Sequence, residues 1–542
     1  MDSIERPVRT AFLDATDAAG LSFAHRNGAR GEFWYPELMH AGVALLDYDG
    51  DGWLDVYLVQ SGSLPPSPRV ATDGNRLYRN RGDGTFEDRT VQARVEGRGY
   101  GTGALAGDYD GDGWTDLYVT ALGSNTLYRN LGNGAFEDVT VAAGAADPGY
   151  AAAATFLDFD RDGHLDLFVC HYVDWSPARE KECLGFHGKR GYCNPSEYPP
   201  TPDTLLRNDG NGTFTDVSET AGIRAARGAC LGVVAADLDG DGWVDLYVAN
   251  DQMANHLWIN QRDGTFREEA LLRGAALDEL GRPEASMGIA IGDPDGDGDW
   301  DLFVTHLAGE SNTYYSNEGG GVFRDVTDSL GLGTVSLPYT GFGTGFLDFD
   351  HDGRLDVFVA NGKVKPGPDA LPDYREPKLL LRGESGRYRD VTATSGDCLG
   401  TLEVSRGAAF GDLDEDGDLD VVVANNDGPA RLLRNEQAGR RAVVVAVEDR
   451  TRPAGALGAE LSLEAAGSRQ RRLLQPSYSY GASNDPRAHF GLGSSQRVSW
   501  LRVRWPDGAT LELRDLPVDR TLRVQRASPP SVLANDASRE PR

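Results

Sequence analysis

Seven short stretches of the sequence concentrate aspartate in the pattern D-x-D-x-D-G-x-x-D, beginning with DYDGDGWLD at residues 47–55. Carboxylates at positions 1, 3 and 5 of a tight loop can turn toward one centre, and the glycine at position 6 permits the turn. A backbone carbonyl at position 7 and the carboxylate at position 9 complete an all-oxygen shell. Such a shell suits Ca²⁺ better than Mg²⁺, which gives up its water reluctantly. The spacing differs from an EF-hand, whose bidentate glutamate stands at position 12.

The alternative for a single copy is a solvated acidic turn, but seven copies of one pattern favour metal loops. The sequence therefore predicts about seven structural Ca²⁺ ions and no organic cofactor. The predicted ligands, with position 7 acting through its carbonyl, are Asp47, Asp49, Asp51, Trp53 and Asp55; Asp108, Asp110, Asp112, Trp114 and Asp116; Asp158, Asp160, Asp162, His164 and Asp166; Asp237, Asp239, Asp241, Trp243 and Asp245; Asp293, Asp295, Asp297, Asp299 and Asp301; Asp348, Asp350, Asp352, Arg354 and Asp356; Asp412, Asp414, Asp416, Asp418 and Asp420.

A repeated β unit must position these loops. A short apolar stretch precedes each loop, and a β-rich stretch such as DVYLV (55–59) follows it. A strand of the LYRN or LLRN type usually comes next, and then a turn and a last strand such as GDGTFED (82–88). Four short strands per unit, repeated every 50 to 79 residues, are typical of propeller blades.

The predicted fold class is all-β: a seven-bladed β-propeller of four-stranded blades in residues 1–436, followed by a small β domain in 437–527 and a flexible tail in 528–542. The seventh unit lacks a last strand, and AFLDATDAAGL (11–21) resembles the last strand of other units. We therefore expect the N-terminal strand to close blade seven. The residues five places before each loop are small and fit innermost strands around a channel: Gly42, Gly103, Ala153, Gly232, Gly288, Gly343 and Gly407.

The composition and the first residues indicate which binding partners and which cellular location to expect. The chain has 542 residues and a formal charge of −31, which argues against nucleic acid or an anionic membrane as a partner. It has no apolar run of 18 residues, so no membrane span is predicted. The first residues, MDSIERPVRTAFLD, lack the apolar core of a signal peptide, which predicts a cytoplasmic protein. We expect the protein to be a monomer. A secreted protein is the alternative if an upstream signal has been removed.

Five cysteines leave at least one unpaired within the chain. Cys183 and Cys193 bracket a short loop and could form a disulfide, or could be two unrelated thiols.

A second set of candidate residues lies at the opposite end of the second strands, five places after each final loop aspartate. This register holds mostly polar residues, and further polar or aromatic residues follow it closely. Such positions can line the mouth of a propeller, where small ligands bind; the alternative is that the asparagines start turns. The predicted ligand-binding residues are Gln60, Asn250, Asn361, Lys363, Asn425, Asn426, Tyr172 and Trp175, and the candidate catalytic residues are His171, His306, Asp251 and Asp174.

The aspartate loops, the repeated blades and the C-terminal stretches GASNDPRAHFGLG (481–493) and VRWPDG (503–508) resemble the cartilage acidic protein 1 family, with FG-GAP-like (VCBS) repeats and an ASPIC/UnbV domain. The resemblance covers about residues 9 to 525. The resemblance implies a secreted binding protein, because members of this family are typically secreted. It also implies a role in natural product biosynthesis, because UnbV proteins occur in enediyne gene neighbourhoods.

Two functions follow as hypotheses. The leading one is a cofactor-independent biosynthetic enzyme that acts on a small organic ligand by acid–base chemistry, such as ring opening, cyclisation or C–C bond formation. The ligand would bind at the upper face, which is the face of the ring opposite the aspartate loops. His171 and His306 would serve as general acid and base, with Asp251 or Asp174 orienting one of them, and the asparagines would hold an oxyanion. The alternative is a non-catalytic, secreted, calcium-dependent adhesion module that binds a protein or glycan.

Overall fold

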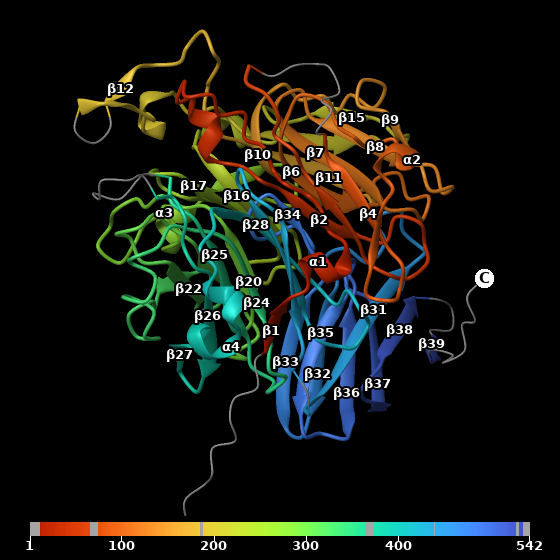
Figure 1. Ribbon diagram of the computed structural model, residues 1–542. Coiled ribbons are helices and arrows are strands. Elements are labelled where there is room, and N and C mark those ends of the chain that lie inside the picture. Colours follow the sequence, from red (N-terminus) through yellow and green to blue (C-terminus); the bar gives the residue numbers. More distant parts are fainter. Residues whose placement is uncertain are drawn as a thin grey trace, which may run out of the picture.

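The computed structural model describes residues 11–65, 74–184, 188–364, 373–437 and 439–526, and the backbone of residues 531–534. Figure 1 shows a ring of small sheets with a second, smaller group of sheets on one side of it. No described helix is long and apolar enough to cross a membrane. Parts of the loops 61–75 and 362–378, and most of the predicted tail, lie outside the described residues.

Seven four-stranded antiparallel units form the ring, as the sequence predicts. Their strands, from the channel outward, are β2 (Val43–Leu46), β3 (Asp55–Leu58), β4 (Arg76–Asn80) and β5 (Phe86–Asp88); β6 (Tyr100–Gly107), β7 (Asp116–Gly123), β8 (Thr126–Asn130) and β9 (Phe136–Asp138); β10 (Gly149–Leu157), β11 (Asp166–His171), β14 (Thr204–Asn208) and β15 (Phe214–Asp216); β16 (Cys230–Ala236), β17 (Asp245–Asn250), β18 (His256–Asn260) and β19 (Phe266–Glu268); β20 (Ile289–Gly292), β21 (Asp301–Val304), β22 (Thr313–Asn317) and β23 (Phe323–Asp325); β24 (Gly341–Leu347), β25 (Asp356–Asn361), β26 (Leu379–Glu384) and β27 (Arg387–Asp390); β28 (Ser405–Gly411), β29 (Asp420–Asn425), β30 (Arg431–Asn435) and β1 (Phe12–Asp14).

Short helical turns lie in the connections between blades: α1 (Thr16–Ala19), α2 (Thr90–Ala93), α3 (Ala270–Arg273), α4 (Thr392–Ser395), η1 (Tyr35–Leu38), η4 (Ile223–Ala225) and η5 (Asp397–Gly400). Another, η3 (Pro195–Glu197), lies within blade 3, between β11 and β14. A small hairpin of β12 (Cys183–Leu184) and β13 (Arg190–Gly191) lies within the long insert of blade 3 and projects from the ring in Figure 1.

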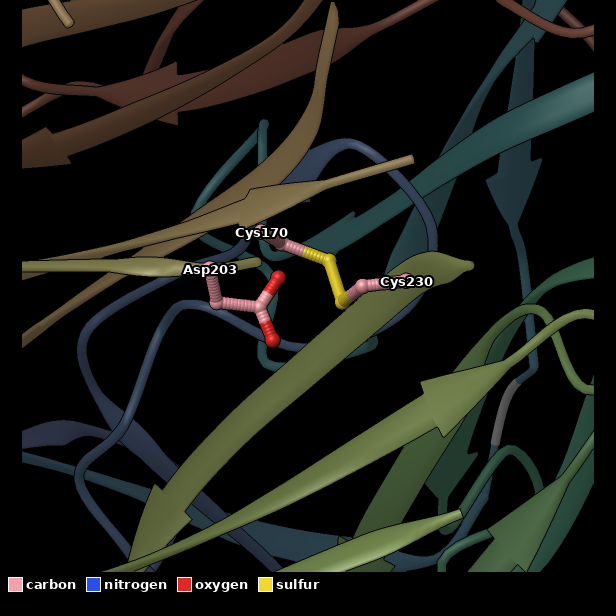
Figure 2. Close-up of side chains that lie close together, drawn as sticks. All are labelled: Cys170, Asp203 and Cys230. Carbon is pink, nitrogen blue, oxygen red and sulfur yellow. A yellow bond between two sulfur atoms is a disulfide. The ribbon is translucent and has the colours of Figure 1, made fainter. Parts of the chain in front are cut away.

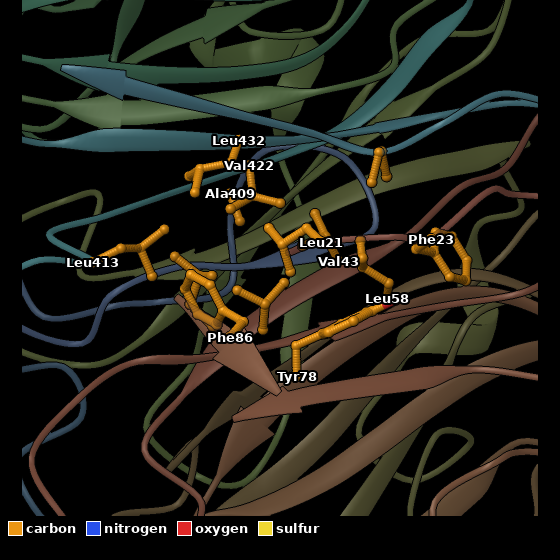
Figure 3. Packing of buried hydrophobic residues seen from close by; sticks show 14 of the residues in the cluster. Leu21, Phe23, Val43, Leu58, Tyr78, Phe86, Ala409, Leu413, Val422 and Leu432 are labelled. Atoms are coloured by element: carbon orange, nitrogen blue, oxygen red, sulfur yellow. The ribbon is translucent and has the colours of Figure 1, made fainter. Parts of the chain in front are cut away.

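The N-terminal strand closes the ring. β1 pairs antiparallel with β30, with Phe12 opposite Asn435 and Asp14 opposite Leu433, so blade 7 is built from both parts of the chain. Its neighbour packs against it through the cluster in Figure 3, where Val43 and Leu58 of blade 1 meet Val422 and Leu432 of blade 7. A closed ring leaves no free seam between the first and last blades.

The small residues before each loop lie where innermost strands of neighbouring blades approach each other. A side chain at Gly42 would meet Cα of Gly103 at 2.5 Å, and one at Gly288 would meet the carbonyl oxygen of Phe342 at 2.0 Å. Glycine is required there because any larger residue would push two blades apart. This confirms the predicted crowding around the channel.

The C-terminal residues form two further four-stranded sheets. One holds β31 (Arg441–Asp449), β35 (Ala488–Gly493), β38 (Thr521–Arg526) and β39 (Ser531–Ala534); the other holds β32 (Glu460–Ala465), β33 (Ser468–Leu473), β36 (Arg497–Arg504) and β37 (Thr510–Pro517). A core that includes Val445, Leu463, Leu501 and Phe490 fills the space between them. β39 falls within the segment predicted as a tail.

One segment of this C-terminal region leaves its own sheets and enters the propeller. Residues 475–485, which we call the channel segment, run from β33 toward the ring centre and return through β34 (Ala482–Ser483) to β35. β34 pairs in parallel with β2, with Ala482 opposite Val43, and Figure 1 places it among the innermost strands.

The channel segment hydrogen-bonds to the innermost strand of every blade. The backbone groups that face a propeller channel have no strand beyond them, so an inserted segment can satisfy them. The bonds, from blade 1 to blade 7, are Val43 N to Gly481 O (3.3 Å), Ala104 N to Gly481 O (3.4 Å), Gln475 Nε2 to Phe156 O (3.4 Å) and to Ala235 O (3.3 Å), Ser479 N to Ile289 O (2.7 Å), Thr344 N to Ser479 Oγ (3.0 Å) and Phe410 N to Asn484 Oδ1 (3.0 Å).

Candidate metal centres and the filled channel

The first aspartate of each loop organises the turn. In blade 1, Asp47 accepts hydrogen bonds from the backbone N–H groups of Gly50 (2.8 Å), Asp51 (3.1 Å) and Gly52 (2.9 Å). Gly50 and Gly52 have φ of 74° and 93°, which a side chain would strain. The D-x-D-x-D-G spacing thus folds each loop around its own first carboxylate.

The ninth aspartate fastens the loop to its blade. Asp55 is fully buried and accepts the N–H of Tyr48 (3.0 Å) with one oxygen and the N–H of Asn80 (2.7 Å) with the other. Asn80 in turn donates to the carbonyls of Leu54 (3.1 Å) and Leu413 (2.7 Å), so it ties the loop of blade 1 to that of blade 7.

This asparagine is a functional residue that the sequence reasoning missed. The sequence does indicate it, because asparagine is the last residue of each LYRN or LLRN strand. Five equivalents reach a backbone carbonyl of a neighbouring blade in the same way: Asn130, Asn208, Asn260, Asn317 and Asn435.

The carboxylates converge as a metal site requires. Oxygens of Asp47, Asp49 and Asp55 lie within 4.8 Å of one another, and the same three positions converge in blades 2, 3 and 4. One carboxylate oxygen in each of three loops, from Asp49, Asp237 and Asp414, is buried without a hydrogen-bond partner. Clustered hard oxygens, some of them without donors, fit a divalent cation such as Ca²⁺.

Electrostatics point the same way. Burial, followed by the neighbouring loop carboxylates, raises the pKa of Asp47 to about 6 and that of Asp108 to about 6. Burial raises the pKa of Asp116 to about 8. Repulsion and desolvation of this kind disfavour the ionised loop, and a bound cation would relieve both.

Arginines contact many of these carboxylates. Arg79, on the third strand of blade 1, pairs with Asp49 and with Asp51 (2.6 Å), and Arg129 pairs with Asp110 (2.7 Å) in blade 2. The sequence reasoning did not assign these arginines, although the strand motif repeats them.

The C-terminal sheets supply more arginines to the same face. Residues 437–526 contain 15 arginines against nine acidic residues, whereas the whole chain carries −31. Arg452 pairs with Asp158 of blade 3, and Arg440 pairs with Asp350 of blade 6 at 2.7 Å. The basic C-terminal region therefore packs on the acidic loops. The excess of arginine in this part of the sequence could have predicted that contact.

The predicted catalytic histidines are buried in the protein. His306 is 0% exposed, and its ring contacts the Ser311 carbonyl (3.0 Å) and Ser286 Oγ (3.1 Å). Burial lowers its pKa to about 3. His171 contacts the Pro202 carbonyl (3.1 Å) and a carboxylate oxygen of Asp147 (3.3 Å).

The predicted orienting carboxylates lie against other groups. Asp174 pairs with Arg179, and Asp251 accepts a hydrogen bond from Tyr172. Acidic partners of the two histidines are instead Asp147 and Glu284 (3.5 Å from His306), because the connections between blades bring these residues beside the rings. The geometry thus gives the proposed acid–base pair no support.

The asparagines at the same register serve the turns, which is the alternative that the sequence left open. Side-chain amides of Asn250, Asn361 and Asn425 donate to carbonyls four to sixteen residues further on: Ala254 (2.8 Å), Pro377 (2.8 Å) and Pro429 (2.7 Å). Gln60 accepts from Arg26 N (2.6 Å), Asn426 donates to Glu37 O (2.9 Å), and Lys363 lies 4.0 Å from Glu376.

Aromatic side chains close the channel mouth above the channel segment. The Tyr35 hydroxyl lies 2.5 Å from that of Tyr172, and Trp175 packs in the same buried cluster. Tyr480, at the tip of the channel segment, donates to Met39 O (2.9 Å) and packs against Phe342 with ring centroids 4.9 Å apart. The upper mouth is therefore packed with side chains.

Two disulfides are present. Cys183 pairs with Cys193, one of the two possibilities for that loop, and Cys398 is free. Cys170 of β11 pairs with Cys230 of β16, which joins blades 3 and 4 across 60 residues (Figure 2). Asp203 lies beside this bridge, and burial raises its pKa to about 8. The pairing was not predicted, since the two cysteines meet only once neighbouring blades pack.

Comparison with curated proteins finds cartilage acidic protein 1. The human protein is 28% identical over 322 residues, which cover 57% of this chain and 46% of that protein. The mouse protein is 29% identical over 325 residues, which cover 57% and 47%. The chain thus spans about half the length of these relatives. Among solved structures, the BP39L lectin from Burkholderia pseudomallei is similar at a TM-score of 0.42 and 11% identity, covering 74% of this chain and 98% of the lectin.

These findings overturn one expectation. A cytoplasmic location is wrong, because the relatives are cartilage acidic protein 1, a secreted extracellular protein. The two disulfides are consistent with this correction, since such bonds persist mainly in oxidising compartments and not in the cytoplasm. The comparisons also give no support to a biosynthetic enzyme or to a link with natural products.

Family models match most of the propeller and the C-terminal region. The FG-GAP-like repeat matches residues 47–119, 108–169, 196–248, 237–304 and 293–359. The ASPIC and UnbV model matches residues 450–530, which include the channel segment. The chain therefore belongs to the FG-GAP-like repeat family, and it combines that propeller with an ASPIC and UnbV domain.

Proposed function

We propose that this protein is a non-catalytic, calcium-stabilised binding module that works outside the cell and recognises a protein or glycan. The observation that carries the proposal is the packed channel. The channel segment occupies the ring centre, and aromatic side chains such as Tyr35, Tyr172 and Tyr480 fill the mouth above it. A propeller filled in this way offers its outer surfaces rather than a central pocket.

Calcium would act as a structural ion in this proposal. In blade 1, Asp47, Asp49, Asp51 and Asp55 would hold it, together with the carbonyl of Trp53. A bound Ca²⁺ would neutralise the carboxylate charge that Arg79, paired with Asp49 and Asp51, balances only in part. About seven such sites would fix the turns on one face of the ring, and the C-terminal domain would rest on that face.

The experiment uses the full chain on arrays of glycans and extracellular-matrix proteins, once loaded with Ca²⁺ and once treated with EGTA. We expect a defined set of ligands to be retained by the calcium-loaded protein and released by EGTA. Retention that is identical after EGTA would contradict the calcium dependence. Consumption of a bound small molecule over time, followed by NMR, would contradict the non-catalytic assignment.

A further inference from the structure

A cleft of about 540 Å³ lies where the loop of blade 7 faces the C-terminal domain. This volume falls in the range of small-molecule sites, which often form at domain interfaces. One wall comes from the loop residues Glu415–Asp418 and from His351 of the blade 6 loop. The opposite wall comes from the start of β31 and from the turn at residues 519–521, which leads into β38.

The acidic wall differs from the other loops of the ring. Position 4 of this loop is Glu415, where most blades have glycine, and position 7 is Asp418, an acidic residue that only blade 5 shares, as Asp299. Glu415 pairs with Arg487, and Asp418 lies 3.2 Å from His351 Nε2. Both extra carboxylates therefore already have partners within the protein.

The basic wall holds one guanidinium that is not matched. Arg440 pairs with Asp350 (2.7 Å), and Arg441 pairs with Asp519. The Arg520 side chain is exposed and has no carboxylate within ion-pair distance among the described residues; its guanidinium donates to the Val518 carbonyl at 3.5 Å. An unpaired guanidinium in a cleft is suited to bidentate binding of a carboxylate or sulfate.

We propose that this cleft binds a small anionic sugar, such as a uronic acid or a sulfated monosaccharide. Arg520 would pair with the acid group, and Arg441 would lie beside it. The polar side chains of Gln437 and Thr521 line the remaining walls and match hydroxyl groups better than an apolar ligand. The inference rests on the proposed function, because it names a ligand class for the binding module.

The test titrates the full-length, calcium-loaded protein with glucuronate, with glucose 6-sulfate and with neutral glucose, and follows binding by calorimetry. We expect the two anionic sugars to bind and glucose to bind at least about tenfold more weakly. Arg520→Ala should weaken glucuronate about tenfold or more. Arg514→Ala removes a 72% exposed arginine of β37 outside the cleft and should change nothing.

The outcomes separate this site from the calcium proposal, because Arg520 belongs to no metal loop. If glucuronate binds, Arg520→Ala weakens that binding and the protein contains no calcium, the cleft assignment is supported and the calcium proposal is wrong. If the calcium content is as proposed but glucuronate fails to bind at about 10 mM, or binds Arg520→Ala equally well, the cleft assignment is wrong. Equal binding of glucose and glucuronate would also overturn it.

Discussion

Removal of one side chain from the channel segment should destabilise the whole propeller. Asn484 is 1% exposed. It accepts the N–H of Phe410 at 3.0 Å, and it donates to the carbonyls of Pro476 (2.7 Å) and Tyr478 (3.3 Å). In Asn484→Ala, the Phe410 N–H would be buried without a partner, and the segment would lose two bonds that hold its shape.

The expected cost follows from these contacts. A buried donor left without a partner costs about 1–3 kcal/mol, and each remaining bond contributes about 1 kcal/mol. We expect Asn484→Ala to lower the free energy of unfolding by about 3 kcal/mol, which is a factor of roughly 100 in the opening equilibrium. Asn133→Ala is the matched control, because Asn133 only accepts the Ala135 N–H in an exposed turn, so it should cost less than about 0.5 kcal/mol.

Hydrogen exchange by mass spectrometry gives the assay, with peptides from β6, β24 and β28 as reporters. These innermost strands contact the channel segment in the intact protein. We expect faster exchange in all three strands of Asn484→Ala at constant calcium. Faster exchange confined to the C-terminal sheets would refute the reasoning, because it would mean that the propeller stands without its channel segment.

Three further perturbations test the buried groups. His306→Ala should lower the melting temperature, at a cost of about 1–3 kcal/mol, since Ser286 and the Ser311 carbonyl lose a partner; an unchanged melting curve would argue against a structural role. The pair Cys170→Ala and Cys230→Ala should cost about 4 kcal/mol in urea unfolding, because a 60-residue loop is released. The control pair Cys183→Ala and Cys193→Ala should leave the propeller transition in place, and equal effects of both pairs would contradict this. Burial raises the pKa of Asp116 to about 8, so the folded metal-free protein keeps a proton that the unfolded chain loses above about pH 4. Stability without calcium should therefore fall as pH rises from about 4 to 8, and added Ca²⁺ should raise the melting temperature more at pH 8 than at pH 5; an equal rise at both would oppose this assignment.

Local and periodic signals made the fold predictable. The aspartate loops fix where each blade turns, and the strand motifs around them fix the register, so blade number and the closing role of residues 12–14 could be inferred. The glycines at one register, such as Gly42 and Gly288, were equally informative because close backbone approach leaves no other choice. These features depend on neighbouring residues or on the repeat itself.

The candidate site depended on contacts that no local pattern encodes. The channel segment QPSYSYGASND has no periodicity, and its seven-blade contacts exist only after the ring has closed. The register that holds His171 and His306 could not show that Tyr35 and Tyr480 pack together with other aromatic residues in the channel mouth. The pairing of Cys170 with Cys230 and the seating of Arg452 on Asp158 likewise arise from tertiary packing.

We propose that bound calcium holds the blade turns of this protein. The most direct measurement is the calcium content of protein that has been stripped with EGTA, reloaded and dialysed, with its melting temperature recorded in parallel. We expect roughly seven Ca²⁺ per chain and a fall in melting temperature on stripping that calcium alone reverses, since each site filled at 100 times its Kd contributes about 2.7 kcal/mol. Less than one ion per chain, or a melting temperature unaffected by EGTA, would contradict it.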